Sequence, residues 1–303
     1  MAFTAKDVQA LREKTGCGMM DCKKALTECD GNMDAAADFL REKGLASQAK
    51  KASRVAAEGT VCAYTKDNVG VVVELNAETD FVANGVEFKA LASKVAEVIA
   101  EQNPADVDAL LKCEKNGQTV EQMVQELFLA VRENIKVRRF VRYEGKTVTY
   151  VHAGGKIGVM VKFDTELAAD NADFVAMGKN VAMQIAAMNP TYLDEASVPA
   201  EAIEKEKEIL IAQMKEDPKM ANKPEAVLGK IVEGKIGKFY KENCLVEQQF
   251  VMDGELTVGK YVEKTAKELG ADIKIDAFVR FEKGEGIEKR VDDFAAEVAG
   301  MIK

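Results

Sequence analysis

The sequence predicts an α+β fold whose core contains two repeated subdomains. Two observations predict this class. Two strand-like runs, helical patterns and a closing strand-like run occur twice in the same order. Helical patterns without strands precede the first copy, interrupt the second and follow it. The predicted domains are a three-helix domain with its linker (1–55), core subdomain N (56–145), core subdomain C (146–282) with an inserted antiparallel helical hairpin (about 191–241), and a C-terminal helical module (283–303).

Three short helices are expected before the core. Thr4 is a typical N-cap residue, and Asp7 three residues later can complete a capping box. Gly44 is expected to end the third helix in the left-handed conformation that glycine adopts easily. Residues 45–57 are rich in Ala, Ser and Lys, and we expect a partly helical linker there. The second and third helices are expected over 19–27 and 33–43.

The two core units repeat each other in sequence. Gly70-Val71 recurs as Gly158-Val159, and Thr119 and Thr257 lie 138 residues apart. Corresponding residues stay 138 positions apart from these threonines to the end of the closing strand-like run in each unit. Each unit is therefore expected to form a small antiparallel sheet with helices covering one face. The opening strands are expected over 60–65 and 70–75 in the first unit, and over 147–151 and 158–163 in the second.

The insertion in the second unit contains two amphipathic helical patterns. Pro218 and Pro224 lie between them and force a turn, which predicts an antiparallel hairpin. A hairpin of this length is too short for an independent coiled coil and is typical of self-association or partner binding, so it would allow a homodimer. The chain ends in a further amphipathic pattern, with apolar residues at Ile287, Val291, Phe294, Val298 and Met301.

Composition excludes several classes of protein. The net charge of −9 is unfavourable for general nucleic-acid binding, which requires many cations facing phosphates. The apolar runs are too short for a transmembrane helix, and the first residues do not resemble a signal peptide, so we expect a cytoplasmic protein. The six cysteines form no CxxC pair and there is one histidine, so we expect no zinc site.

The motifs of common enzymes are absent from the sequence. It contains no GxxxxGK[ST] loop, no dinucleotide-binding GxGxxG and no GxSxG elbow. His152 is the only possible histidine base, and its position at a strand end favours a half-exposed structural residue. We therefore expect no catalytic site and no cofactor. The alternatives are a binding protein that changes its partner, a plain adaptor, and a small-molecule enzyme using the groove between the repeats.

Residues 78–84, Glu-Thr-Asp-Phe-Val-Ala-Asn, form the corner between a buried strand and a helix. Thr79 and Asp80 are helix-starting residue types. Phe81 could pack into the core or face solvent, where corners of this kind usually lie. The equivalent corner of the second unit, 166–170, has no aromatic residue. The core of the repeat therefore does not need the ring, and Phe81 is a candidate contact for a partner.

Three segments resemble signatures of the bacterial elongation factor Ts family. The segment 15–26 (TGCGMMDCKKAL) is similar to the N-terminal signature, and 78–84 (ETDFVAN) is similar to the second. The segment 281–289 (FEKGEGIEK) resembles the C-terminal module. The resemblance extends over the whole chain in order. Asn84 stands where the family commonly has Lys or Arg, and this removes a positive charge beside Asp80 and Phe81.

The resemblance implies a guanine nucleotide exchange factor that binds elongation factor Tu, GDP-bound or nucleotide-free, during translation. It implies a ubiquitin-associated-like fold for the three helices. It also implies that Asp80 and Phe81 reach into the partner's GTPase domain near its magnesium and phosphate site, that the helix after Gly286 returns to that domain, and that His152 with 250–252 meets the partner's third domain. The residues expected to bind the partner are Met19, Met20, Lys23, Thr79, Asp80, Phe81, Val82, His152, Val251 and Met252.

Overall fold

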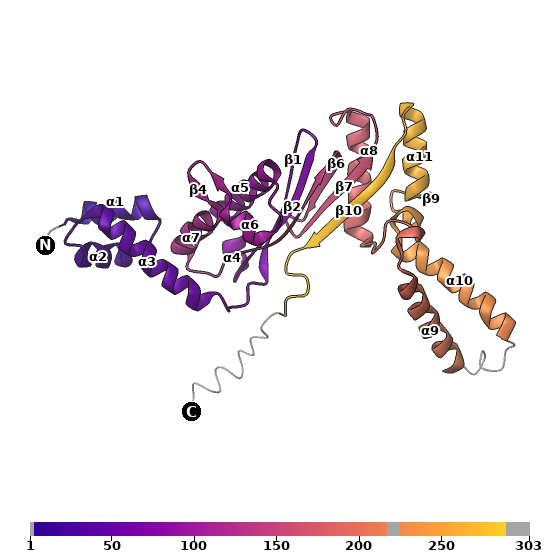
Figure 1. Cartoon of the computed structure of the whole chain (residues 1–303), viewed down its shortest axis with the longest axis horizontal. Coiled ribbons are helices and arrows are strands. Elements are labelled where there is room, and N and C mark those ends of the chain that lie inside the picture. Colours follow the sequence, from indigo (N-terminus) through magenta and orange to yellow (C-terminus); the bar gives the residue numbers. More distant parts are fainter. Residues whose placement is uncertain (1–2, 217–224, 289–303) are drawn as a thin grey trace.

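The computed structural model describes residues 3–216 and 225–288 and has the predicted α+β class (Figure 1). The predicted C-terminal helix falls mainly on 289–303, outside the described residues, as does the tip of the hairpin. Helices occupy the N-terminal end and the hairpin, and two small sheets form the centre (Figure 1).

The N-terminal unit contains α1 (Ala5–Thr15), α2 (Met19–Glu28) and α3 (Met33–Lys51). The capping box predicted at Thr4 is present, because its side chain accepts from Asp7 N and the Asp7 carboxylate accepts from Thr4 N at 2.6 Å. Eight residues of this unit, together with Leu129 of α7 (Val120–Val131), form one hydrophobic cluster. The N-terminal helices are therefore packed onto the core through α7.

The prediction that Gly44 ends the third helix is wrong, because α3 continues to Lys51. A Cβ added at Gly44 would lie 2.0 Å from Cδ2 of Leu129. A glycine at this position lets α3 approach α7 closely, so its role is packing and not helix termination.

Subdomain N contains a three-stranded antiparallel sheet in the order β1-β2-β5. Helix α5 packs on β1 and β2 and buries an apolar face that includes Phe88, Val95 and Ile99. The elements of this unit are β1 (Glu58–Lys66), β2 (Val69–Ala77), α4 (Asp80–Ala83), α5 (Val86–Gln102), α6 (Val107–Lys112), β3 (Glu114–Lys115), β4 (Gln118–Thr119), α7 and β5 (Lys136–Glu144).

Subdomain C repeats this arrangement, with a sheet in the order β10-β7-β6 and α8 packed on β6 and β7. Its inserted α9 and α10 form the predicted hairpin around Leu210, Met214, Val232 and Ile236. The elements are β6 (Lys146–His152), β7 (Ile157–Asp164), α8 (Ala172–Met188), η1 (Glu195–Ser197), α9 (Ala200–Glu216), α10 (Glu225–Asn243), η2 (Leu245–Glu247), β8 (Gln249–Phe250), β9 (Asp253–Thr257), α11 (Val258–Leu269) and β10 (Lys274–Glu282).

The repeat extends to the helix ends. Asn103 and Asn189 end α5 and α8 in the left-handed conformation, with φ of 48° and 46°. Thr119 and Thr257 begin α7 and α11, and each side chain accepts a hydrogen bond from the N–H three residues later. The two copies therefore share their local start and stop signals as well as their sheets.

The inner faces of the two sheets pack on each other, with α5 and α8 on the outside (Figure 1). Val61 and Val72 of one sheet meet Met160 and Phe281 of the other. The close approach depends on a glycine: a Cβ added at Gly158 would lie 2.3 Å from Cγ1 of Val61. The Gly70-Val71 and Gly158-Val159 repeat thus has a structural reason, since a Cβ at Gly70 would likewise lie 2.5 Å from Oγ1 of Thr147.

We expect Gly158→Ala to lower the free energy of unfolding by about 1–3 kcal/mol, because the added methyl group forces the two sheets apart. Chemical denaturation monitored by circular dichroism measures this effect. Gly234→Ala in α10 is the matched control, since nothing lies within 4 Å of its added Cβ. That control should raise stability by up to about 1 kcal/mol through helix propensity. Equal effects of the two substitutions would contradict the close-packing role.

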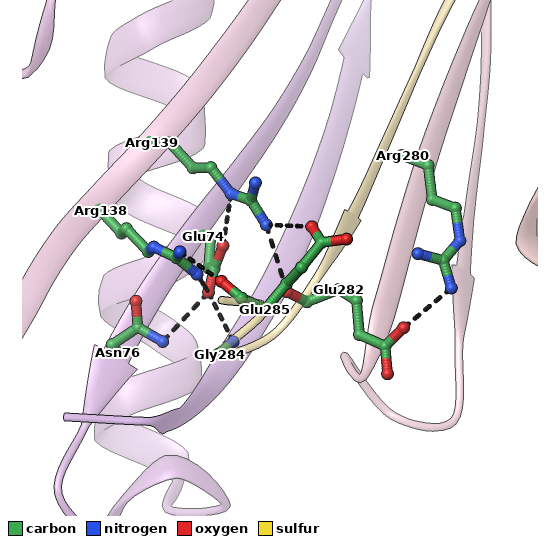
Figure 2. Close-up of polar contacts among 8 residues, drawn as sticks. All are labelled: Glu74, Asn76, Arg138, Arg139, Arg280, Glu282, Gly284 and Glu285. Carbon is green, nitrogen blue, oxygen red and sulfur yellow. Dashed lines mark hydrogen bonds and ion pairs between the residues drawn. The ribbon is translucent and has the colours of Figure 1, made fainter. Parts of the chain in front are cut away.

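A buried carboxylate joins the two subdomains at the end of β10 (Figure 2). Glu74 of β2 is completely buried and accepts hydrogen bonds from Arg138 Nη1 at 3.0 Å and Arg139 Nε at 2.6 Å. It also accepts from Asn76 Nδ2 at 3.1 Å and from the backbone N–H of Gly284 at 2.7 Å. One carboxylate in subdomain N thus holds the chain that leaves subdomain C.

Arg139 extends this cluster along the same segment. Its guanidinium lies 4.2 Å from the centre of the Phe281 ring and donates to the Glu285 carboxylate at 3.0 Å. Burial alone would raise the pKa of Glu74, but the hydrogen bonds from Gly284, Arg138, Arg139 and Asn76 outweigh it and hold this pKa below its usual value. Glu74 is therefore ionised and paired at neutral pH.

Candidate functional site

The corner after β2 places Phe81 in solvent. Thr79 is the N-cap of α4, and its Oγ1 accepts from Val82 N at 3.3 Å. The one turn that follows points Val82 into the hydrophobic cluster of subdomain N, whereas the Phe81 side chain is 86% exposed. Asp80, next to it, is also exposed. The corner therefore presents a large apolar ring and a carboxylate side by side.

Subdomain C does not build this corner. Residues 165–171 join β7 to α8 without a helix in the position of α4, and Leu167 packs partly against the core. The equivalent corner of the second copy also has no aromatic residue, so Phe81 is an addition to one copy. The exposure of Phe81 agrees with this interpretation, because a phenylalanine that the core needs is normally buried.

A hollow of about 570 Å³ lies beside the ring. It is lined by Phe81, Phe88, Leu127 and Val131 among others, from the corner, α5 and α7. A second hollow of about 750 Å³ lies between the N-terminal helices and α5 and α7. Both are lined by residues within 14–131, so neither is the groove between the repeats that a small-molecule enzyme was expected to use.

The second predicted contact is the start of α2. Met19 and Met20 are exposed, with Met20 at 73%, and Lys23 is exposed on the next turn. The opposite side of α2 buries Cys22, Ala25 and Leu26, so the methionines are not needed for the core of the helical unit. Two exposed methionines make a flexible apolar surface that suits a protein partner.

The structure brings this helix and the Phe81 corner to the same end of α7. Arg132, which ends α7, donates from Nη2 to the Asp21 carboxylate of α2 at 2.8 Å. The next residue, Glu133, accepts from Thr79 N at 3.0 Å. No pattern in the sequence marks Arg132 or Glu133 as functional, because their partners lie far away in the chain.

The third predicted contact lies in subdomain C. His152 is exposed at the end of β6, where its Nδ1 is 2.9 Å from the hydroxyl of Tyr150. Val251 and Met252 are exposed in the turn between β8 and β9. Both the histidine ring and the neighbouring turn are therefore accessible to a protein partner.

Gln184 of α8, which the sequence analysis missed, holds that turn from inside. Its side chain is completely buried, and its Oε1 accepts from Val251 N at 2.9 Å. Its Nε2 donates to Gln249 O at 3.1 Å and to Gln248 Oε1 at 3.2 Å. A buried amide with three partners fixes the backbone that presents Val251 and Met252.

We expect Gln184→Leu to free the turn, since Val251 N loses its acceptor at a cost of about 1–3 kcal/mol. The measurement is amide hydrogen exchange at Val251, which should accelerate. Asn180→Leu, one turn earlier on α8, is the matched control: its Nδ2 donates to the Tyr261 hydroxyl at 2.8 Å and not to the backbone of the turn. Unchanged exchange in Gln184→Leu would show that the turn is held by other contacts.

Within the described residues, no group of three or more His, Cys, Asp and Glu side chains is arranged to hold a metal ion. In the same part of the chain, no helix combines the length and the apolar character needed to cross a bilayer. The exposed side chains of the site include the large apolar residues Met20, Phe81 and Met252. Exposed methionine and aromatic side chains are typical of protein-binding surfaces.

Comparison with known proteins identifies the family. The family model described as "Elongation factor TS" matches residues 78–285. The chain is 48% identical to elongation factor Ts of Syntrophotalea carbinolica over the full length of both proteins. It is 49% identical to that of Clostridium perfringens strain SM101, over 99% of each chain, and 47% identical to that of Clostridium botulinum strain Okra, over 98% of this chain and 97% of the relative. With its repeated core, N-terminal helices and exposed corner, the chain belongs to the elongation factor Ts family.

Proposed function

We propose that this protein is a guanine nucleotide exchange factor that binds elongation factor Tu and promotes GDP release during translation elongation. The observation that carries the proposal is Phe81: a phenylalanine ring 86% exposed on a capped corner that the core does not require. Family membership and the resemblance of the 78–84 segment to the family signature support it. The protein itself is then not an enzyme with a catalytic constellation, and it works in the cytoplasm.

In this proposal Phe81 acts as a wedge in the partner's GTPase domain. The ring gains roughly 1.5–3 kcal/mol if it is fully buried between partner helices. The elements it displaces no longer hold magnesium and phosphate well, so the disruption of the nucleotide site is indirect. Thr79 and Val82 support the wedge, and Asp80 contributes a negative charge beside it.

Thermodynamic linkage makes direct contact with the nucleotide unnecessary. A factor that binds nucleotide-free elongation factor Tu more tightly than the GDP-bound form must weaken GDP binding by the same ratio. Met19, Met20 and Lys23 supply a second contact, and His152, Val251 and Met252 supply a third. Several tethered contacts raise the effective concentration of the wedge at its site.

In this proposal, each domain of the chain has its own role in binding the partner. The three-helix domain and linker (1–55) dock on the GTPase domain, subdomain N (56–145) carries the wedge, and subdomain C (146–282) reaches the partner's third domain. The C-terminal module (283–303) returns to the GTPase domain. The hairpin within about 191–241 is the candidate surface for a homodimer; direct contact with nucleic acid or membrane is not part of the mechanism.

Release of fluorescently labelled GDP from elongation factor Tu, with and without this chain, tests the proposal. We expect the chain to accelerate release in a concentration-dependent and saturable manner. Stable binding without acceleration would identify an adaptor and contradict the exchange function. Absence of binding would contradict the assignment of the partner.

A further inference from the structure

The loop 132–134, Arg-Glu-Asn, between α7 and β5 connects both surfaces that the proposed function places on the GTPase domain. Arg132 ends α7 in the left-handed conformation, with φ of 61°, which turns the chain sharply. The three residues then contact α2, the end of α3, the residues that follow α3, and the Phe81 corner. The contacts with the N-terminal helices join residues about 80 to 110 positions apart in the sequence. The contact with the Phe81 corner joins residues about 55 positions apart.

On the side of the corner, the loop and the corner exchange hydrogen bonds. The Glu133 carboxylate accepts from Thr79 N at 3.0 Å and from Thr79 Oγ1 at 2.7 Å. In return, Glu78 accepts from Asn134 N at 2.7 Å. The Thr79 hydroxyl therefore donates to Glu133 while it accepts from Val82 N, so its rotamer is determined from both directions.

These contacts matter because α4 cannot orient itself. It has four residues, Asp80–Ala83, far fewer than an isolated helix needs to be stable. The direction of its first turn, and with it the direction of Phe81, must come from the N-cap and from the buried Val82. The Glu133 carboxylate holds the N-cap residue Thr79 by accepting from both its backbone N–H and its side-chain hydroxyl.

On the other side, the same loop binds the N-terminal unit and its linker. Arg132 Nη2 is 2.8 Å from the Asp21 carboxylate, one residue after Met20, and Lys51 Nζ donates to Arg132 O at 2.6 Å. Asn134 is almost fully buried, and its Nδ2 donates to Arg54 O at 2.8 Å. The start of α2 is thus tied to the residue adjacent to the one that holds Thr79.

We propose that Glu133 and Arg132 are positioning residues for nucleotide exchange: their loop sets the placement of Phe81 relative to Met19 and Met20. The inference rests on the proposed function. Two tethered contacts reinforce each other only when their spacing matches the partner, and a pre-oriented side chain loses less freedom on binding. Glu133 does this without touching the nucleotide.

Glu133→Gln tests the inference with minimal change of shape. The amide oxygen can accept from Thr79 N, but the N–H₂ group then lies where a carboxylate oxygen accepted from Thr79 Oγ1. The hydroxyl must turn and reverse that hydrogen bond, and both bonds lose the charge of the carboxylate. We expect GDP release at saturating concentrations of the chain to be about tenfold slower, as for the loss of one hydrogen bond to a charged group. Glu121→Gln, an exposed glutamate on the first turn of α7, is the matched control and should release GDP like the wild type.

A double-mutant cycle with Phe81 separates positioning from general damage. If Glu133 acts through the ring, Glu133→Gln should cause no further loss in the Phe81→Ala background. A tenfold loss in both backgrounds, or wild-type release by Glu133→Gln alone, would overturn the inference.

A second measurement does not depend on the partner. Amide hydrogen exchange of Thr79 and Val82 in the free chain should be at least about tenfold faster in Glu133→Gln, because the N-cap loses its support. Unchanged exchange would refute the positioning role even if the proposed function is correct. A wild-type chain that fails to accelerate GDP release, with faster exchange in the variant, would instead refute the proposed function.

Discussion

Phe81→Ala is expected to slow the GDP release promoted by this protein by about one to two orders of magnitude. The ring contributes roughly 1.5–3 kcal/mol when it is fully buried in a partner, and each 1.4 kcal/mol corresponds to a factor of ten. Because the side chain is 86% exposed in the free chain, its removal leaves no cavity. Stopped-flow release of labelled GDP from elongation factor Tu measures the effect.

Two controls make this result specific. Circular dichroism and thermal unfolding of Phe81→Ala should match the wild type, since Val82 and not Phe81 anchors the corner in the core. Ile209→Ala removes another exposed apolar side chain, on α9 of the hairpin, and should leave release unchanged. Wild-type release by Phe81→Ala would exclude the wedge, whatever the affinity of the complex.

Glu74→Gln is expected to lower the free energy of unfolding by about 3 kcal/mol, the largest effect on stability among these predictions. The substitution removes the charge that Arg138 and Arg139 face and replaces one acceptor oxygen by a donor. The loss is large because the Glu74 side chain is completely buried, so an unpaired donor placed there is costly. Denaturant unfolding at neutral pH measures the loss.

Glu285→Gln is the matched control, because the Glu285 carboxylate pairs with the same Arg139 at 3.0 Å but is about half exposed. An exposed ion pair contributes at most about 1 kcal/mol, so this variant should unfold close to the wild type. Equal losses in the two variants would show that burial of Glu74 is not what makes the cluster strong.

The pH dependence of Glu74→Gln has a definite sign. The folded pKa of Glu74 lies below its usual value, so ionised Glu74 stabilises the fold fully above the ordinary carboxyl range. That contribution is lost as the pH falls below this range and through the lowered folded pKa. The stability difference between wild type and Glu74→Gln should therefore shrink in acid, and a constant difference would contradict the lowered pKa.

Local sequence patterns predicted much of the fold because they depend on interactions between residues close together in the chain. The predicted Thr4 cap acts within three residues and is present in the structure. The repeated positions Thr119 and Thr257 are also N-caps. Asn103 and Asn189, each followed by a proline, stand at two helix ends and both adopt the left-handed conformation. The repeat then predicted two equivalent sheets, which the strand orders confirm.

The same local rules failed at Gly44. A glycine after an amphipathic stretch fits a helix end, but it equally fits a helix that must approach another closely. Leu129, the residue that decides between them, lies 85 positions away. A sequence pattern does not carry contacts over such distances, so the continuation of α3 to Lys51 could not be predicted from it.

For the candidate site, the residue types of the corner and its absence from the second repeat were readable in the sequence, and they singled out Phe81. Whether the ring faced solvent, and which residues held it, depended on tertiary contacts. Glu133 is an ordinary glutamate in a loop until the fold places it against Thr79, and Glu74 is a charge in an apolar strand until Arg138, Arg139 and Gly284 surround it.

The fold class, the repeated core, the caps at Thr4 and Thr79 and the family resemblance could be read from the sequence, because they depend on periodicity, short-range hydrogen bonding and local motifs. The packing of the N-terminal helices on α7, the close approach of the two sheets at Gly158, and the groups that meet at Glu74 and Glu133 depend on tertiary contacts. These features arise when folding brings residues that are distant in the sequence into contact. Such long-range contacts produce no periodic pattern in the sequence from which they could be predicted.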